Sequence, residues 1–131
     1  MKDKEKQIEG MKVKSTETIV ISGGRASGKT YYAISELTKY GRCVVLGINE
    51  RSGTYFKTIN NKIHYFTKKQ EKLVLKILET HPDRIIIDEF SFKEDFELYK
   101  ELRNLFDDII LVLRVNHGIR TYRDNTIYIS Y

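Results

Sequence analysis

Cysteine and proline are scarce in this chain of 131 residues, and each shortage narrows what the protein can be. Cys43 is the only cysteine, so the chain cannot form an internal disulfide of the kind that stabilises many small secreted proteins. Pro82 is the only proline, and we expect it to end the helix that precedes it. The histidines are scattered, and no Cys or His cluster has the spacing of metal ligands. The sequence therefore does not predict a structural zinc site.

Long apolar segments are also lacking, which bears on location. No apolar run approaches the length of a membrane-crossing helix, and no membrane partner is expected. Residues 1–14 alternate Lys with Asp and Glu and have no apolar signal-peptide core, so we expect a charged N-terminal arm and a cytoplasmic location. An apolar content of 40% and a charged content of 31% indicate one soluble domain, which we place at residues 15–131. The net charge of +5 is mildly basic and suits a polyanionic partner.

Apolar strands and amphipathic helices alternate along the rest of the chain. We expect Cys43 to be buried near the start of a strand, a helix C-cap at Gly41, and a loop at 52–61, where the chain is polar and contains Gly53. Continuous apolar strands separated by amphipathic helices indicate a parallel sheet covered on both faces. The predicted fold class is therefore α/β, with three α/β/α layers and a mainly parallel central sheet. The predicted strands are 16–22, 42–49, 63–66, 84–90, 108–115 and 126–131, and the predicted helices are 29–40, 68–80 and 93–105.

One segment matches the phosphate-binding P-loop pattern GxxxxGK[ST], or Walker A motif, over its full length. Its glycines let the backbone fold around an anion, so that N–H groups point at phosphate oxygens. Lys29 supplies a positive charge for the β- and γ-phosphates, and the Thr30 hydroxyl is placed to bind Mg²⁺. The strand before the motif and the helix after it are the context that this loop requires. The predicted nucleotide-binding residues of the motif are Gly23, Gly24, Arg25, Ala26, Ser27, Gly28, Lys29 and Thr30.

A second motif, Ile-Ile-Ile-Asp-Glu at residues 85–89, has the form of a Walker B strand. It delivers two consecutive carboxylates at the carboxyl end of a buried strand. We expect Asp88 to hold Mg²⁺ together with Thr30. Glu89 should point to the other side of the strand and act as the catalytic base that activates water. Together the two motifs predict a site for ATP and Mg²⁺.

The two motifs resemble those of P-loop NTPases of the additional-strand catalytic-glutamate division. Within that division, Gly23-Gly24-Arg25 before Ser27-Gly28-Lys29 is similar to the first motif of the terminase large subunits, which are phage DNA-packaging ATPases. The segments 39–41 and 87–90 also look like those of the small packaging ATPases of short-tailed phages. The resemblance covers about residues 17 to 116. It implies a P-loop NTPase fold and a phage protein in the host cytoplasm.

The resemblance also implies roles for individual residues. Arg25 matches an arginine that reaches the γ-phosphate, and Asn116 follows the fourth main strand, where related ATPases carry a polar sensor residue. Tyr31 or Tyr32 could stack on adenine, since the usual upstream glutamine motif is not evident. The nuclease domain of the large terminase subunits is absent from this sequence. A basic and aromatic stretch, 114–123, could contact nucleic acid or a neighbouring subunit, or be a solvated loop.

Three functions remain open from the sequence. The first is an ATPase that couples hydrolysis to translocation or packaging of double-stranded DNA, working as a homo-oligomer or with phage packaging or replication proteins. The second is a small nucleoside kinase, because residues 88–92 are similar to the Asp-Glu-x-x-Phe segment of type II thymidine kinases. That family's zinc-binding cysteines are absent here. The third is a nucleotide-binding phage accessory or regulatory module with little turnover.

Overall fold

The computed structural model describes residues 18–22, 28–39, 41–114 and 126–130. The expected arm and the stretch at 115–125 lie outside the described residues. The strands are β1 (Thr18–Ser22), β2 (Cys43–Gly47), β3 (His64–Thr67), β4 (Arg84–Phe90), β5 (Ile109–Leu113) and β6 (Thr126–Ser130). The helices are α2 (Lys29–Glu36), α3 (Glu50–Ile59), α4 (Leu73–Thr80) and α5 (Phe92–Leu105).

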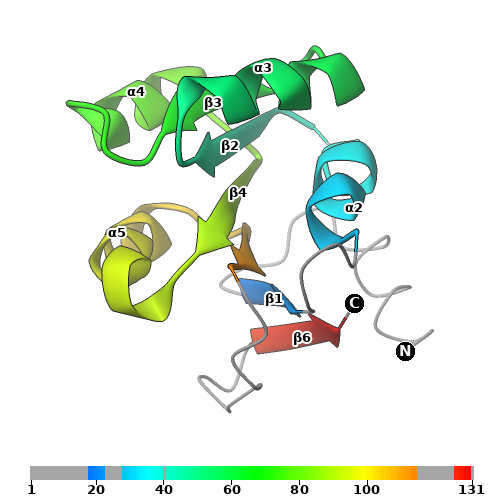
Figure 1. Ribbon diagram of the computed structural model, residues 1–131. Helices are drawn as coiled ribbons and strands as arrows, with labels where there is room; N and C mark the ends of the chain where they lie inside the picture. The colour runs from blue at the N-terminus through cyan, green and yellow to red at the C-terminus, as the bar shows by residue number, and fades with distance from the viewer. Residues whose placement is uncertain (1–17, 23–27, 40, 115–125, 131) are drawn as a thin grey trace.

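The strands form one sheet of six strands in the order β3-β2-β4-β5-β1-β6 (Figure 1). Each neighbouring pair is parallel. The prediction of an α/β fold with a parallel sheet is therefore confirmed. Because all strands run the same way, the chain leaves β1 and β4 at the same edge of the sheet. In parallel sheets this carboxyl edge is where ligands bind.

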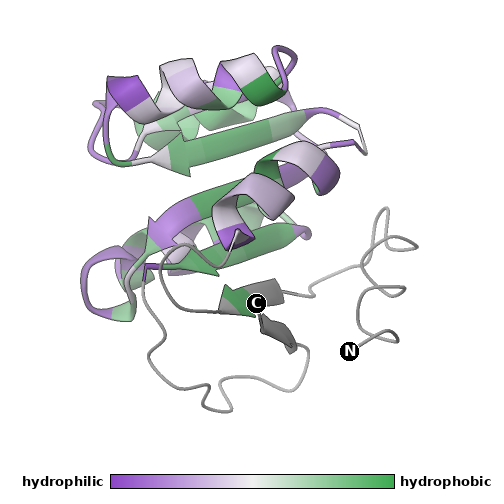
Figure 2. Ribbon diagram, turned by 45° about the vertical axis from the view of Figure 1, so that its right-hand side comes forward, coloured by the Kyte–Doolittle hydropathy of each residue, from purple (hydrophilic) through white to green (hydrophobic). Residues whose placement is uncertain are grey.

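The apolar residues of the strands are divided between two separate core clusters. Ile86 belongs to the first cluster with residues of α2 and α3, whereas Ile85 and Ile87 belong to the second with residues of α4 and α5. The alternation follows from the strand geometry, which points successive side chains to opposite faces. Both sets are buried, which explains why the central strands are continuously apolar (Figure 2).

The prediction of a loop at 52–61 is wrong, because α3 occupies most of this segment. The Asn49 side chain accepts a hydrogen bond from the Ser52 N–H at 3.0 Å and caps the start of the helix. Phe56 is buried in the first core cluster, and Gly53 is buried too. The glycine suggested a loop, but packing of this face outweighs its weak helix propensity.

Two predicted helices are longer than the observed ones. Helix α2 ends at Glu36 with Leu37 as its C-cap, so the C-cap predicted at Gly41 is also wrong. Helix α4 begins at Leu73, and residues 68–72 form turns rather than its first part. Helix α5 begins at Phe92, one residue before its predicted start, and ends where predicted.

Cys43 opens β2 and is buried, as expected. Burial raises the pKa of its thiol to about 11, although the nearby Arg84 acts against this, so Cys43 remains a thiol at neutral pH. Among the described residues, no helix combines the length and apolar character needed to cross a membrane.

Candidate functional site

The site is built around a hydrogen bond between the ends of two distant segments. The Thr30 Oγ1 hydroxyl donates to Asp88 Oδ1 at 3.0 Å, and the two residues lie 58 positions apart in the sequence. Thr30 belongs to the first turn of α2, which follows β1, and Asp88 lies near the end of β4. Strand β5 lies between β1 and β4 in the sheet. The start of α2 must therefore extend past the end of β5, along the carboxyl edge of the sheet, for Thr30 to reach Asp88.

The start of α2 depends on a glycine. Gly28 has φ 87° and ψ 6°, a left-handed conformation that glycine adopts without the clash of a Cβ. Its carbonyl accepts from the Tyr32 N–H at 2.9 Å. Lys29 is the first helical residue and is largely buried, while Tyr31 is 57% exposed and Tyr32 packs against the first core cluster. Of the two tyrosines, Tyr31 is thus the more exposed.

A β-bulge holds the two consecutive carboxylates at the end of β4. Ile87 pairs with Leu111 of β5 and Phe90 pairs with Leu113, so Asp88 and Glu89 together oppose a single residue of β5. Glu89 occupies the left-handed region with φ 52°, which is uncommon for a residue with a side chain. Residues in such sparsely populated conformations cluster at active sites, although Lys72 and His81, the two caps of α4, also have positive φ.

The bulge changes which way the following side chain points. Strict alternation from Ile85 and Ile87 would place Phe90 on the opposite face, in the first core cluster. Instead Phe90 is buried in the second cluster, where its ring contacts that of Tyr99 at a centroid distance of 5.9 Å. Phe90 therefore does not follow strict alternation from Ile87, because the extra residue resets the alternation after the bulge.

Glu89 faces a cation that the sequence did not link to it. Arg114 Nε lies 3.6 Å from Glu89 Oε2, an ion pair beyond hydrogen-bonding distance. Arg114 Nη1 also lies 3.2 Å from an oxygen of Glu94 in the first turn of α5. Arg114 follows β5, and its N–H donates to the carbonyl of Phe90 at 3.0 Å. Because β5 and β4 are neighbours, the residue after one strand meets the acidic pair of the other.

A buried lysine contacts the bulge from the other side. Lys68 follows β3, and its Nζ donates to the carbonyls of Asp88 at 3.0 Å and Glu89 at 2.9 Å. It also pairs with Asp95 Oδ2 of α5 at 3.0 Å. Sequence reasoning missed both Lys68 and Asp95. The only available signal was that Lys68 follows a strand, and its partner depends on the strand order.

The donor set suits a hard cation. Burial raises the pKa of Asp88 to about 6, against the hydrogen bond from Thr30, which lowers it. The raised pKa means that burying the ionised carboxylate costs free energy, and a cation beside Asp88 would compensate for this cost. In the described part of the chain, no three His, Cys, Asp or Glu side chains gather into a metal-binding group. Mg²⁺ in nucleotide sites uses one or two carboxylates and completes its shell with phosphates and water, so the Thr30 and Asp88 oxygens fit it.

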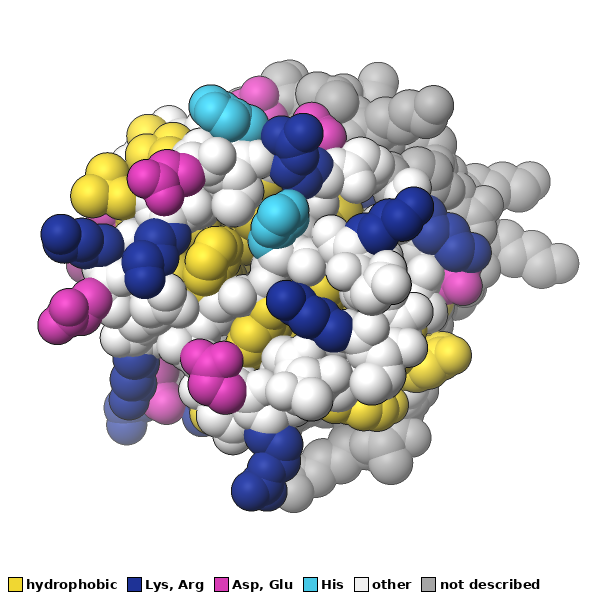
Figure 3. All heavy atoms as spheres, turned by 90° about the horizontal axis from the view of Figure 1, so that it is seen from above, with side chains coloured by type: hydrophobic (Ala, Val, Ile, Leu, Met, Phe, Trp, Pro, Cys, Tyr) yellow, Lys and Arg dark blue, Asp and Glu magenta, His cyan; other side chains and the backbone are white. Residues whose placement is uncertain are grey.

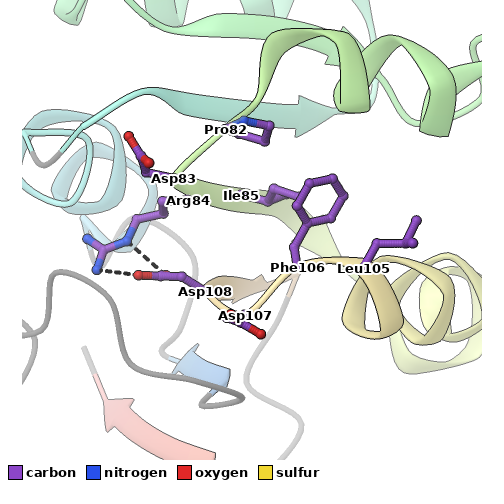
Figure 4. Close-up of a pocket in the computed structure, with 8 residues that line it drawn as sticks. All are labelled: Pro82, Asp83, Arg84, Ile85, Leu105, Phe106, Asp107 and Asp108. Carbon is purple, nitrogen blue, oxygen red and sulfur yellow. Dashed lines mark hydrogen bonds and ion pairs between the residues drawn. The ribbon is translucent and has the colours of Figure 1, made fainter.

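The opposite edge of the sheet carries a pocket of a different kind (Figure 4). Its volume is about 220 Å³, and Pro82, Ile85 and Phe106 are among its lining residues. The Asp108 carboxylate in its wall is bound to Arg84, at 2.9 and 3.0 Å from Nε and Nη2. The pocket lies at the amino ends of β4 and β5, away from Asp88 and Glu89, and shares no residue with the candidate site.

The structure describes only some of the predicted site residues. Lys29, Thr30, Tyr31, Asp88 and Glu89 all lie at the carboxyl edge of the sheet or in the first turn of the helix that begins there. The remaining predicted site residues lie outside the described residues: Gly23, Gly24, Arg25, Ala26, Ser27 and Asn116.

Positive charge is not concentrated on the face that carries α3 and α4. On this face Lys and Arg side chains are interspersed with Asp and Glu (Figure 3). Mixed charge of this kind does not favour a polyanion there.

The chain matches no protein-family model and no curated protein. What the site can do chemically therefore follows from its own residues. It offers a hydroxyl and a buried carboxylate for a cation, and a lysine at the start of a helix for an anion. A second carboxylate, Glu89, is 40% exposed and accessible to water.

Proposed function

We propose that this protein binds ATP with Mg²⁺ and hydrolyses it, as a P-loop NTPase with a three-layer α/β/α fold. The observation that carries the proposal is the hydrogen bond of 3.0 Å between Thr30 and Asp88. It joins the last residue of a GxxxxGK[ST] motif to a strand-end carboxylate, the two positions that share Mg²⁺ in this class of protein. Strand β5 lies between β1 and β4, which agrees with the additional-strand division that the motifs resemble.

Each described residue has a defined part in this proposal. Thr30 and Asp88 hold the metal, and Lys29 with the N–H groups at the start of α2 binds the phosphates. Bound Mg²⁺ supplies the positive charge that the β- and γ-phosphate oxygens need as the bond to the leaving group breaks. Tyr31 is exposed beside the motif and is the residue proposed to stack on adenine.

Glu89 is the proposed general base. Its carboxylate accepts a proton from the attacking water, and that water forms the new bond to the γ-phosphorus as the bond to the β-phosphate oxygen breaks. The ion pair with Arg114 competes with this role, so Glu89 must turn from Arg114 toward the water. Arg25 is proposed to stabilise the charge of the transition state, and Asn116 to contact the nucleotide.

The partners in this proposal come from the resemblance to packaging ATPases. Double-stranded DNA is the proposed substrate of the mechanical work, and a homo-oligomer the proposed working form. A rise in ATP hydrolysis on adding double-stranded DNA, together with a solution mass above that of one chain, supports this part.

Glu89→Gln tests the hydrolysis proposal. The amide keeps the size of the side chain but cannot take a proton, so turnover should fall about 10²- to 10⁴-fold while the affinity for Mg²⁺-ATP stays near that of the wild type. Glu97→Gln is the matched control, because Glu97 is an exposed residue of α5 and should leave both quantities unchanged. Binding would be measured by calorimetry and turnover by release of phosphate.

The products separate the proposed function from its alternatives. Free phosphate from ATP and water supports the ATPase. A phosphorylated nucleoside, formed only when a nucleoside is added, would replace it with the kinase. Tight binding without turnover by the wild type, with or without DNA, would replace it with a nucleotide-binding accessory or regulatory module.

A further inference from the structure

We infer that Lys68 is a positioning residue, which holds the Asp88–Glu89 bulge in the shape that the reaction needs. The inference rests on the proposed function, because it assigns Lys68 to the same site. Lys68 is not a phosphate ligand. Its side chain is only 8% exposed, and its three ammonium donors are matched by three acceptors within 3.0 Å.

The carbonyls of Asp88 and Glu89 lie where pairing with the neighbouring strands is interrupted. Pairing of β4 with β2 ends at Leu46 and Ile87, one residue before Asp88. On the other side, pairing with β5 skips Asp88 and Glu89 and resumes at Phe90. Backbone carbonyls that are buried without a partner are costly. Lys68 supplies the hydrogen bonds that the neighbouring strands do not.

Lys68 is itself held in place at both ends. Its N–H donates to the carbonyl of Gly47 at 2.9 Å, which continues the pairing of β3 with β2. At the far end, Asp95 Oδ2 accepts from Lys68 Nζ and from the Ser91 N–H at 2.9 Å. The contact therefore ties β2 and α5 to the bulge, on the side away from Arg114. Lys68 and Arg114 together determine where the Glu89 carboxylate lies.

A cluster of this kind also contributes to stability, so the test must separate the two roles. Lys68→Met removes the charge and the donors but leaves Asp95 as a buried carboxylate without its cation, and the protein is expected to melt at a lower temperature. Lys68→Met combined with Asp95→Asn removes both charges, and the asparagine oxygen can still accept from Ser91. The double variant should therefore regain much of the melting temperature, while the bulge still lacks its donors.

Two readouts on the full chain test the positioning role. Turnover of ATP at saturation should fall about 10- to 100-fold in the double variant, the range seen when residues that orient catalytic ligands are removed, with little change in KM. The Arg114 N–H bonds the carbonyl just after the bulge, so its hydrogen exchange should accelerate. The Ile85 N–H, bonded to Asp108 at the opposite end of the same strands, should not change. Lys69→Met, at the exposed neighbouring lysine, is the control and should match the wild type.

Wild-type turnover and wild-type exchange at Arg114 in the double variant would overturn the inference. Failure of the proposed function gives a different result, in which the wild type itself does not hydrolyse ATP. In that case the exchange of Arg114 still decides whether Lys68 holds the bulge: faster exchange in the double variant supports this, and unchanged exchange overturns it.

Discussion

Asp88 combines a buried position with the chemistry of a metal ligand. It is 5% exposed, and burial raises its pKa to about 6 from the ordinary value of 3.8. An ionised carboxylate there opposes folding when no cation is present. The residue proposed for Mg²⁺ binding is thus one that weakens the fold without the metal.

Asp88→Asn should therefore stabilise the protein and abolish the Mg²⁺-dependent part of nucleotide binding. The pKa of Asp88 is about 6 in the folded wild type and 3.8 as the ordinary value, so between these pH values the folded state binds a proton that the unfolded chain does not. The free energy of unfolding of the wild type should therefore fall as pH rises from about 4 through the folded pKa. At pH 8 without Mg²⁺, the variant should be more stable by up to about 3 kcal/mol, the equivalent of a shift of two pKa units. The measurement is urea unfolding with a chelator at several pH values.

The control for Asp88→Asn is Glu101→Gln, at an exposed position of α5. It should leave the pH dependence of the unfolding free energy as in the wild type. If the curves of Asp88→Asn and of the wild type ran parallel from pH 4 to pH 8, burial of Asp88 would not have the cost assigned to it.

At the scale of elements, the contact between α3 and β3 centres on the aromatic ring of Tyr65. Tyr65 of β3 donates its hydroxyl hydrogen to the carbonyl of Asn49 at 2.6 Å and packs edge to face with Phe56 of α3 at 5.8 Å between ring centroids. A Cβ on Gly53 would overlap the Tyr65 ring. The absence of a side chain at Gly53 therefore lets α3 lie close to β3.

Gly53→Ala tests this packing, because its effect is opposite to that expected from helix propensity. In an open helix the change stabilises by about 0.5 to 1 kcal/mol. Here we expect a loss of about 1 to 3 kcal/mol, since the new methyl group meets the Tyr65 ring. Urea unfolding of the variant gives the value, and Thr54→Ala, at the exposed next position of α3, serves as the control.

A second background makes the Gly53→Ala test sharper. With Tyr65→Ala the ring is gone, and Gly53→Ala should then be neutral or stabilising. An equal loss in both backgrounds would mean that the ring is not the obstacle.

At the scale of the whole molecule, the two edges of the sheet differ in chemistry. The carboxyl edge holds the acidic bulge, and the amino edge holds the buried pair of Arg84 and Asp108. Arg84 also donates to the carbonyl of Leu37 just after α2, at 3.0 Å, so it joins β4, β5 and the end of α2. Burial raises the pKa of Asp108, although the contact with Arg84 acts against this.

Arg84→Met should weaken the fold and leave the site chemistry intact. Arg84 is 1% exposed, and removing it leaves a buried carboxylate without its cation, which typically costs about 3 to 5 kcal/mol. Adding Asp108→Asn should recover much of this loss. The unfolding free energy reports the effect, and the folded variants should bind Mg²⁺-ATP as the wild type does. Weakened binding in the stable double variant would show that the amino edge is coupled to the site.

Strong local patterns predicted most of the fold. Continuous apolar segments predicted the strands, because a parallel strand is buried on both faces and needs no polar side chains between its ends. The order of the strands was beyond such patterns, since it depends on which elements pack together. Helix α3 was missed because Gly53 lowers the local helix signal, and only contact with Tyr65 explains why glycine lies there.

The candidate site, like the fold, was predicted only in part from the sequence. Motif spacing predicted that Thr30 and Asp88 serve one metal, and the structure brings them within hydrogen-bonding distance. Spacing did not predict the bulge, because one extra residue in a strand has no sequence signature here. Lys68 and Arg114 follow strands that are distant in the sequence, so their contacts with the acidic pair appear only when the sheet order is known.

The sequence by itself determined the class of fold, the two motifs and the edge of the sheet where they meet. These depend on local chemistry: apolar side chains that must be buried, and glycine and carboxylate positions at strand ends. The tertiary structure alone decided the raised pKa of Asp88, the left-handed backbone of Glu89 and the cations on either side of it. The physical reason is that burial, strand pairing and ion pairs join residues far apart in the chain, and no local pattern records them.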